Sequence, residues 1–455
     1  MSLARPIRID LAPLLRPWAS ELITRCIAIE QQAVQRSAEL LTTHLPSGPW
    51  LLAADPHTWE AAGEAVWCGL IGAGVALTHH PIEPDPGKAD PVADDARIDA
   101  LTERLRQGRF TAAVAVGSGT VNDVVKLAAD RAGIPYATVA TAPSMNGYTS
   151  SLAAPLSRGV KTTVPCRPPV VCLVDLEVIA RAPYRMIASG LGDLMSKPVS
   201  NADWRLAYRV LGAPYATRVM ELIEAGAALL DGVPERLPQR DPEAVGKLAA
   251  SLCVSGLAMG IAGSSAPSSG GEHLISHYLD MTHFALGEPH DLHGCQVGVA
   301  TVSTAALYEC LAAWSPADLD LEARLAAHPT WDEYARAVQS RFGPLTEAVL
   351  EHARQGHPTR EELARRLHLL VEEWPSILAD VRQTLRPAAE LVAELTLAGC
   401  PATFGEINVT PERARRALRY SKDIRARYTI LHLAADLGLL ERWSDLTLAT
   451  CHRMG

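Results

Sequence analysis

The sequence is poor in the features that mark secreted, membrane and nucleic-acid-binding proteins. Its nine cysteines are scattered without a CxxC pair or zinc-finger spacing, which predicts reduced thiols in an intracellular protein. A formal charge of −9, with no basic stretch interleaved with aromatics, argues against nucleic-acid binding. The longest apolar run, residues 65–77, is broken by glycines and falls short of the roughly 20 residues of a bilayer span. Arginines and an aspartate interrupt the N-terminal stretch where a signal peptide needs an apolar core. These absences predict a cytoplasmic protein with no membrane span.

The apolar residues that are present suffice for two folded domains. The chain has 455 residues, of which 48% are hydrophobic, and a single core rarely grows to this length. Strand-like runs alternate with helical segments as far as Pro183, and helical periodicity then continues to the end. We therefore predict an α/β domain over residues 1–182 and an all-helical domain over residues 183–455.

The α/β domain is predicted from short apolar runs and the helical segments between them. The predicted strands are residues 50–54, 75–78, 110–116, 136–140 and 170–174. The predicted helices are residues 12–43, 58–70, 98–106 and 124–132. Open α/β sheets bind ligands at the carboxyl ends of their strands, so the residues that follow each strand are candidate contacts.

Two of these strand ends have residues that suit a dinucleotide. Asp55 follows the first strand, where a carboxylate can bind a ribose hydroxyl, and a solvated loop aspartate is the alternative. Residues 117–121 (GSGTV) join a strand to a helix start, which places backbone N–H groups against a pyrophosphate. The third glycine of GxGxxG is missing, and a tight turn between strand and helix is the alternative. The polar loop 141–151 follows the next strand and suits a cofactor or a polyhydroxylated ligand, unless it is an ordinary capped turn.

The helical domain contains a candidate metal site. Residues 270–272 open a helix on which His273 and His277 stand at i and i+4, so both imidazoles project from one face. His293 follows before the next apolar helical run. The best candidate for a carboxylate ligand is Asp193, a glycine-flanked aspartate that we predict at the start of a helix. Two satisfied histidines on a partly buried helix face are the alternative.

Together, seven segments resemble the glycerol-1-phosphate dehydrogenase family, within the metal-dependent polyol dehydrogenase and dehydroquinate synthase-like superfamily. The resemblance covers most of the chain, and the family's order of motifs is kept. The segments are residues 117–123 (GSGTVND), 140–151 (ATAPSMNGYTSS), 190–197 (GLGDLMSK), 202–204 (ADW), 269–281 (SGGEHLISHYLDM), 293–298 (HGCQVG) and 419–441 (RYSKDIRARYTILHLAADLGLLE). The resemblance implies a dehydroquinate synthase-like fold, with a dinucleotide-binding α/β domain and a helical domain that binds metal and substrate.

The resemblance also implies a role for each matching residue. Asp193, His273 and His293 match the metal ligands, and His277 matches a substrate-contacting histidine. Asp55 matches the carboxylate that contacts the adenosine ribose. The remaining cofactor contacts are Gly117, Ser118, Gly119, Thr120, Val121, Thr141, Ala142, Pro143, Ser144 and Ser150.

The sequence departs from the family pattern at Asn146, where the family has an aspartate that contacts substrate. An amide keeps an acceptor oxygen but cannot carry a proton, so this residue bears on substrate identity. Asn146, His277 and Asp193 form the predicted catalytic set. Ser118 replaces a glycine of the family's commoner GGG turn, which is a milder change.

The resemblance implies reversible, NAD(P)H-dependent reduction of dihydroxyacetone phosphate to sn-glycerol 1-phosphate with one divalent metal ion, nickel, zinc or iron. A divalent metal polarises a carbonyl oxygen, and the cofactor, NAD(H) or NADP(H), supplies the hydride. The alternative is a same-fold dehydrogenase acting on another polyol, sugar phosphate or biosynthetic ketone; a cofactor-only binding protein is the non-enzyme alternative. Arg158, Lys161 and Lys197 are candidate contacts for the substrate phosphate. We expect the protein to form a homodimer and to bind a phosphorylated small molecule as its substrate.

Overall fold

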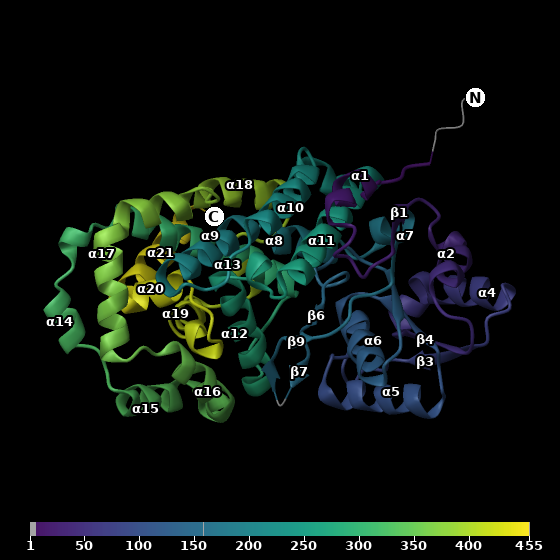
Figure 1. Ribbon diagram of the computed structural model, residues 1–455, viewed down its shortest axis with the longest axis horizontal. Coiled ribbons are helices and arrows are strands. Elements are labelled where there is room, and N and C mark those ends of the chain that lie inside the picture. Colours follow the sequence, from purple (N-terminus) through teal and green to yellow (C-terminus); the bar gives the residue numbers. More distant parts are fainter. Residues whose placement is uncertain (1–5, 158, 455) are drawn as a thin grey trace. The chain divides into compact units, whose positions relative to one another are not determined.

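The computed structural model describes residues 6–157 and 159–454, and these residues form two compact units (Figure 1). The first unit contains the described residues up to Leu194 together with Glu221–Ser265. The second contains Met195–Met220 and the described residues from Ala266 onward. The predicted fold class is confirmed, because an α/β part with a parallel sheet is followed by helices. The predicted domain boundary after residue 182 stays a prediction.

A six-stranded parallel sheet is the centre of the first unit. Its strands, in spatial order, are β1 (Cys26–Glu30), β10 (Val171–Asp175), β5 (Tyr136–Ala140), β4 (Ala112–Gly117), β2 (Trp50–Ala54) and β3 (Leu77–Pro81). The central strands are buried on both faces and therefore read as unbroken apolar runs. This is why the sequence predicts β2 and β5 correctly and the other three expected strands to within a few residues.

Alternate residues of each strand enter two different hydrophobic cores. On one face, Leu52 and Val114 pack with Leu41 and Val66, which come from α2 (Ser37–His44) and α4 (Glu64–Gly72). On the other face, residues such as Ala115 pack against α5 (Asp95–Gln107) and α6 (Gly119–Ala132), which lie side by side in Figure 1. Helices on both faces of a parallel sheet make this a doubly wound unit.

The remaining elements of the first unit are short strands and helices. The hairpin-like pairs are β6 (Leu152–Ala153) with β9 (Val164–Pro165) and β7 (Leu156–Ser157) with β8 (Val160–Lys161). The helices are α1 (Ala12–Leu15), α3 (Pro56–Thr58), α7 (Leu176–Arg181), α8 (Tyr184–Leu194) and α11 (Pro242–Ala262), while α10 (Thr217–Ala227) begins in the second unit and ends in the first. By length and composition α11 could cross a membrane, but 83% of its most apolar window is buried inside the structure, as in a core helix.

The predicted helix over residues 12–43 is wrong. Only α1 and α2 at its two ends are helical, and β1 occupies the middle as an edge strand of the sheet. The leucines and isoleucines of this segment fit a helical period, but Ile29 is buried because β1 pairs with β10. Pairing with a strand that lies more than a hundred residues away is a tertiary effect that overrides local periodicity.

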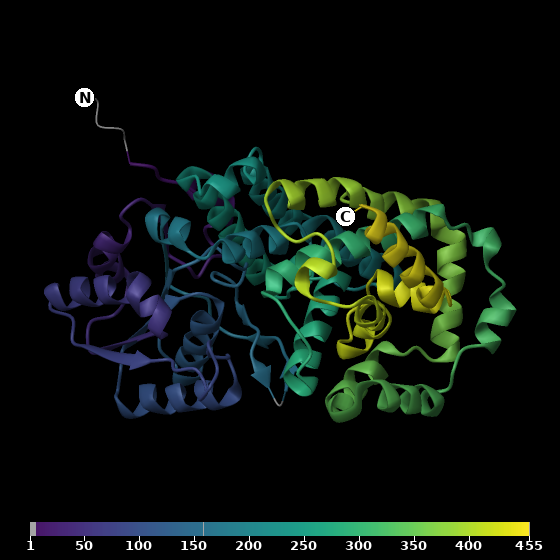
Figure 2. The ribbon, with the colours of Figure 1, turned by 180° about the vertical axis from the view of Figure 1, so that it is seen from behind.

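The second unit is helical throughout its described residues. Its longer helices are α9 (Lys197–Leu211), α12 (Gly271–Leu286), α13 (His293–Ala313), α15 (Trp331–Phe342), α16 (Thr346–Gly356) and α17 (Arg360–Arg382). The others are α14 (Leu321–Ala326), α18 (Ala388–Leu397), α19 (Pro411–Tyr420), α20 (Ile430–Asp436) and α21 (Leu440–Met454). The C-terminal helices, yellow in Figure 2, pack against α12 and α13. The N-cap of α17 is Thr359, which forms a capping box with Glu362.

Candidate functional site

The strand order places a ligand crevice between β2 and β4. The chain moves outward from β2 to β3 on one side and from β4 through β5 to β10 on the other, so the order reverses between these two strands. Such a topological switch point is where open parallel sheets bind ligands, beyond the carboxyl ends of the strands. Asp55 follows β2 and Gly117 ends β4, so two predicted cofactor contacts flank this point.

The turn from β4 into α6 has the geometry of an anion site. A Cβ on Gly117 would lie 2.5 Å from the Cβ of Val121, so only glycine allows this tight turn. The helix that follows has 14 residues and starts at Gly119, and the Ser118 side chain makes no capping hydrogen bond. The N–H groups of the first turn, which includes Thr120, therefore point toward the crevice with the positive end of the helix dipole.

Asp55 has a structural role that the sequence reasoning did not assign. Its Oδ1 accepts a hydrogen bond from the Thr58 N–H at 2.8 Å, and the two residues form a capping box at the start of α3. One carboxylate oxygen thus caps a helix at the switch point. A ribose contact by the same side chain is compatible with this cap and stays a prediction.

The loop of residues 141–151 is held tightly by α8 and α11. A Cβ on Gly190 of α8 would overlap the carbonyl oxygen of Pro143, and a Cβ on Gly256 of α11 would lie 2.7 Å from the Asn146 carbonyl oxygen. Thr149 Oγ1 also donates to the Cys253 carbonyl at 2.6 Å. These close approaches require glycine and fix the path of the loop.

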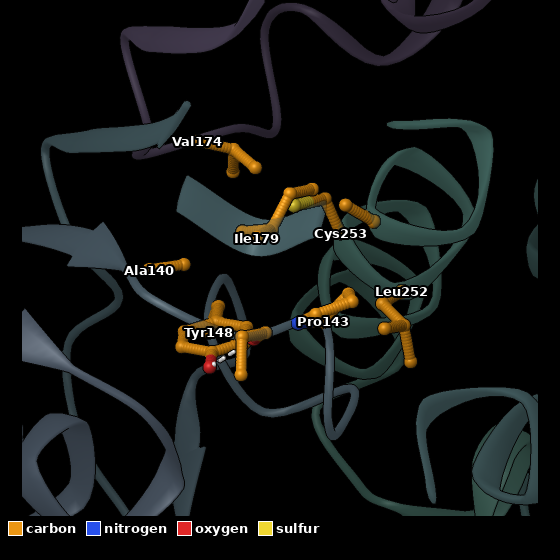
Figure 3. A pocket seen from close by; sticks show the side chains of 9 residues that line it. Ala140, Pro143, Tyr148, Val174, Ile179, Leu252 and Cys253 are labelled. Carbon is orange, nitrogen blue, oxygen red and sulfur yellow. Dashed lines mark hydrogen bonds between the residues drawn. The ribbon is translucent and has the colours of Figure 1, made fainter. Parts of the chain in front are cut away.

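A small pocket lies between this loop and α11 (Figure 3). Its lining is almost wholly apolar, and the Tyr148 hydroxyl in it donates to the Ala142 carbonyl at 2.7 Å. Ala142 and Pro143, both predicted cofactor contacts, have their side chains in this lining. The pocket offers no group that would bind a phosphate or a sugar, so it is a packing void beneath the loop.

Lys126 is the most informative residue that sequence reasoning missed. This side chain of α6 is fully buried, and its ammonium donates to the Gly147 carbonyl at 2.6 Å and the Leu152 carbonyl at 3.0 Å. The Ser150 carbonyl and hydroxyl oxygens lie at 3.2 and 3.3 Å. A lysine among the valines, leucine and alanines of an apolar helix face is the sequence signal that could have revealed it.

The three predicted metal ligands come together. One ligand atom from each of Asp193, His273 and His293 lies within 4.8 Å of the others, and this is the one such group of three among the described residues. Asp193 is fully buried near the end of α8, so its predicted place at the start of a helix is wrong. The helix already begins at Tyr184, directly after Pro183, and the glycines before Asp193 lie inside it rather than in a turn. His273 stands in the first turn of α12, and His293 begins α13.

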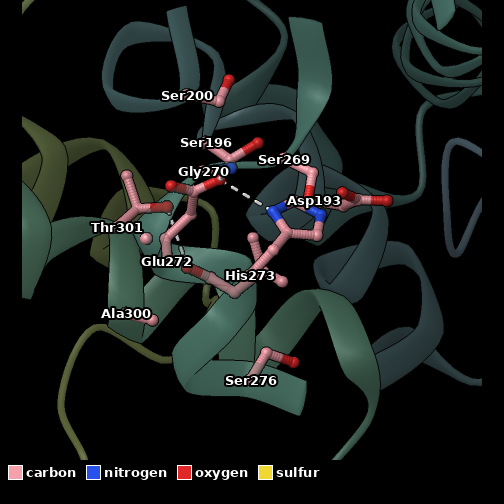
Figure 4. A network of polar contacts seen from close by, with 12 residues as sticks. Asp193, Ser196, Ser200, Ser269, Gly270, Glu272, His273, Ser276, Ala300 and Thr301 are labelled. Atoms are coloured by element: carbon pink, nitrogen blue, oxygen red, sulfur yellow. Dashed lines mark hydrogen bonds and ion pairs between the residues drawn. The ribbon is translucent and has the colours of Figure 1, made fainter. Parts of the chain in front are cut away.

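Each ligand is oriented by a neighbouring polar group, as metal ligands usually are. The Nδ1 of His273 contacts the carboxylate Oε1 of Glu272 at 2.8 Å, and Glu272 also accepts the Gly270 N–H (Figure 4). The Nδ1 of His293 contacts the Ser276 hydroxyl at 3.1 Å. With Nδ1 engaged in both rings, Nε2 is the nitrogen that can coordinate. Two imidazoles and one carboxylate, each oriented in this way, fit nickel, zinc or iron(II).

His277 lies where the prediction requires it. Its buried ring stacks on that of His293, with centroids 5.5 Å apart, and meets that of His273 edge-on at 6.1 Å. The i, i+4 spacing on α12 thus brings a third imidazole beside the two ligand rings without placing it in the ligand group.

A buried aspartate anchors the start of α12, the helix that carries His273 and His277. Asp203 accepts the N–H of Gly271 at 2.7 Å, the N–H of Ile430 at 2.6 Å and the Tyr308 hydroxyl at 2.6 Å. Burial, and then the nearby carboxylate of Glu272, raise the pKa of Asp203 to about 7. Three elements of the second unit are therefore fastened at one carboxylate, including the first residues of α12 and α20.

The candidate phosphate contacts differ in their surroundings. Lys197 is buried at the start of α9, with its ammonium 3.1 Å from the Ser196 hydroxyl, whereas Lys161 is only half-buried. Arg158 lies outside the described residues. Burial thus distinguishes Lys197 from Lys161, and a phosphate contact by either residue stays a prediction.

Comparison with known proteins finds glycerol-1-phosphate dehydrogenases among the relatives of this chain. Residues 28–183 match the family model for iron-containing alcohol dehydrogenase. The glycerol-1-phosphate dehydrogenase [NAD(P)+] of Bacillus velezensis is 30% identical over 386 residues, covering 83% of each chain. That of Bacillus licheniformis is 31% identical over 328 residues, covering 72% of this chain and 68% of its own. That of Pyrococcus furiosus is 38% identical over 211 residues, covering 46% and 60%.

Solved structures share the fold at low sequence identity. A probable glycerol dehydrogenase from Sinorhizobium meliloti 1021 is 15% identical, covering 93% of this chain and 97% of its own, with a TM-score of 0.58. The glycerol dehydrogenase of Schizosaccharomyces pombe is 17% identical, covering 93% and 90%, also with a TM-score of 0.58.

Proposed function

Because this chain belongs to the glycerol-1-phosphate dehydrogenase family, we propose that it reduces dihydroxyacetone phosphate to sn-glycerol 1-phosphate with NADH or NADPH, and catalyses the reverse oxidation. The observation that supports this most directly is the group formed by Asp193, His273 and His293. A chain that had kept the fold but lost the chemistry would not need two imidazoles and a carboxylate in mutual reach.

In this proposal Asp193, His273 and His293 hold one divalent metal ion, which supplies a Lewis acid for the substrate's carbonyl oxygen. The carbonyl carbon of the ketone accepts a hydride from the reduced nicotinamide, and its oxygen accepts a proton. His277, buried against both ligand rings, holds that proton or orients the water that delivers it. The three neighbouring imidazoles line a site from which bulk water is largely excluded.

The dinucleotide is assigned to the switch point of the sheet. The first turn of α6 binds the pyrophosphate through its N–H groups, and Gly117 allows the close approach. Asp55 accepts from a ribose hydroxyl with the oxygen that does not cap α3, and Ser150 contributes from the loop that Lys126 holds. A carboxylate at this place repels a 2′-phosphate, which favours NADH over NADPH.

Lys197 is the phosphate contact that we assign for the substrate. Lys197 is buried and follows Asp193 by four residues in the sequence, which supports this assignment. All nine cysteines are free, which supports a cytoplasmic location. We also propose that the protein is a homodimer, which size-exclusion chromatography with light scattering would test.

The deciding experiment is NADH oxidation by metal-reconstituted protein with dihydroxyacetone phosphate and, separately, with unphosphorylated dihydroxyacetone. We expect turnover with the phosphate alone, and we expect Lys197→Met to raise the KM for the phosphate without changing the KM for NADH. Asp193→Asn is the inactive control. No NADH oxidation with either ketone, in protein shown to bind metal and NADH, would refute the substrate assignment.

A second candidate keeps the fold and cofactor but changes the substrate to another polyol, sugar phosphate or biosynthetic ketone. The observation that favours it is Asn146, which stands where the resemblance implies a substrate-contacting aspartate. A panel of phosphorylated and unphosphorylated ketones, measured at equal concentration, separates the two candidates by their kcat/KM ratios.

A further inference from the structure

Asn146 faces a metal ligand. Its backbone N–H donates to Asp193 Oδ2 at 2.8 Å, and its side-chain Nδ2 donates to Asp193 Oδ1 at 3.0 Å. One residue therefore donates to both oxygens of the carboxylate. Hydrogen bonds to both oxygens fix the plane of the carboxylate, and metal-coordinating side chains are usually oriented by such neighbouring groups.

This geometry gives a physical reason for an amide at position 146. An aspartate in the same rotamer would present a second carboxylate to the buried Asp193, and two like charges at hydrogen-bond distance repel each other. Asparagine replaces that repulsion with a hydrogen-bond donor. The asparagine that departs from the family pattern thus provides a hydrogen-bond donor for the Asp193 carboxylate, which it contacts.

The backbone around Asn146 is fixed from a third helix. The fully buried Lys126 ammonium binds the carbonyl of Gly147, the next residue, at 2.6 Å, and the Leu152 carbonyl at 3.0 Å. These acceptors are uncharged main-chain oxygens of the loop. Burying an ammonium is costly unless its donors are satisfied, so the loop and the lysine hold each other in one arrangement.

We propose that Asn146 is a positioning residue, which orients the Asp193 carboxylate for metal binding, and that Lys126 holds the loop segment that makes this possible. The inference rests on the proposed metal site but not on the identity of the substrate. It differs from a direct substrate contact because its effect is on metal affinity, which can be measured without any ketone or cofactor present.

The test is a chelator-competition titration of full-length, metal-free protein with Zn²⁺ and with Ni²⁺. We expect Asn146→Ala to raise the metal dissociation constant roughly 10- to 100-fold while the dissociation constant for NADH stays within about twofold. Lys126→Met should weaken metal binding as well, and it should also lower the thermal midpoint because three main-chain carbonyls lose their hydrogen bond to the ammonium.

Thr149→Val is the matched control. Thr149 lies in the same loop and donates to the Cys253 carbonyl, and its side chain makes no hydrogen bond to Asp193. This variant should lose stability yet keep metal affinity within about twofold. Wild-type metal affinity in Asn146→Ala, or an equal loss of metal affinity in Thr149→Val, would overturn the inference and leave the proposed metal site standing. Wild-type protein that binds no metal would instead overturn the proposed site and the inference with it.

Discussion

A single methyl group on α11 should displace the loop on which the predicted cofactor and metal contacts meet. In Gly256→Ala the new Cβ would lie 2.7 Å from the Asn146 carbonyl oxygen and 3.0 Å from the Ser150 nitrogen. Both are main-chain atoms, so the loop must move by several tenths of an ångström. Overpacking of this kind costs about 1–3 kcal/mol, while replacing glycine by alanine inside a helix returns about 1 kcal/mol. We expect a net loss of up to about 2 kcal/mol.

Gly260→Ala, one turn later on the same helix, isolates the steric effect. Its Cβ would lie 2.9 Å from Ser151 Oγ, a side-chain atom that can rotate away, so the helix-propensity gain should remain. Urea-unfolding midpoints of the two metal-free variants, with NADH titrations by fluorescence, make the comparison. Gly256→Ala should unfold earlier and bind NADH more weakly, and Gly260→Ala should match or exceed wild type. Equal midpoints for the two variants would refute the steric reasoning.

Three further predictions concern the second unit and the switch point. Glu272→Gln removes the charged partner of the His273 ring and should raise the Zn²⁺ dissociation constant roughly 10-fold or more in chelator competition; unaltered affinity would show that Glu272 does not orient the ligand. Asp55→Ala should raise the KM for NADH and lower stability by about 0.5–2 kcal/mol, whereas Asp55→Ser should keep the cap and lose only the cofactor effect, and an unchanged KM in both would remove Asp55 from the site. Burial, with nearby cationic side chains, lowers the pKa of His432 to about 3, and burial lowers that of His357 to about 4, both below the unfolded value of about 6.5. The native state therefore binds these protons less readily than the unfolded state. The contribution of the two neutral histidines to the free energy of unfolding is complete above pH 6.5 and falls as the pH decreases toward 3, by about 2–3 kcal/mol at pH 4.5 for His432. In His432→Asn the urea-unfolding midpoint should fall less steeply below pH 6.5 than in wild type, and an unchanged pH dependence would contradict the lowered pKa of His432.

Local patterns in the sequence were enough for the central strands and for the histidines of the candidate metal site. Strand β5 is predicted residue for residue, because a strand buried on both faces needs apolar side chains at every position. The pair His273 and His277 follows from helical spacing, and its neighbour His293 from the motif order of the family. In each case the information lies within a few residues of the feature itself or in a set of motifs read together.

Other features depend on partners that are distant in the sequence. Lys126 reaches a loop 21 to 26 residues away, and Asn146 bonds to Asp193 47 residues away. A lysine and an asparagine are ordinarily read as solvated, and only burial shows otherwise. The β1 strand was mistaken for helix for the same reason, since its pairing with β10 is invisible in its own residues.

The return of the chain into the first unit limits how this protein can be taken apart. Residues 195–220 belong to the second unit, yet α11, which follows them, holds the loop of residues 141–151 through Gly256 and Cys253. A fragment cut at Leu194 would therefore contain every strand of the six-stranded sheet but lack α11, against which the loop of residues 141–151 packs. The first unit is an interrupted module. It cannot be transplanted as one contiguous segment, and during synthesis it cannot be completed until residue 265 has left the ribosome.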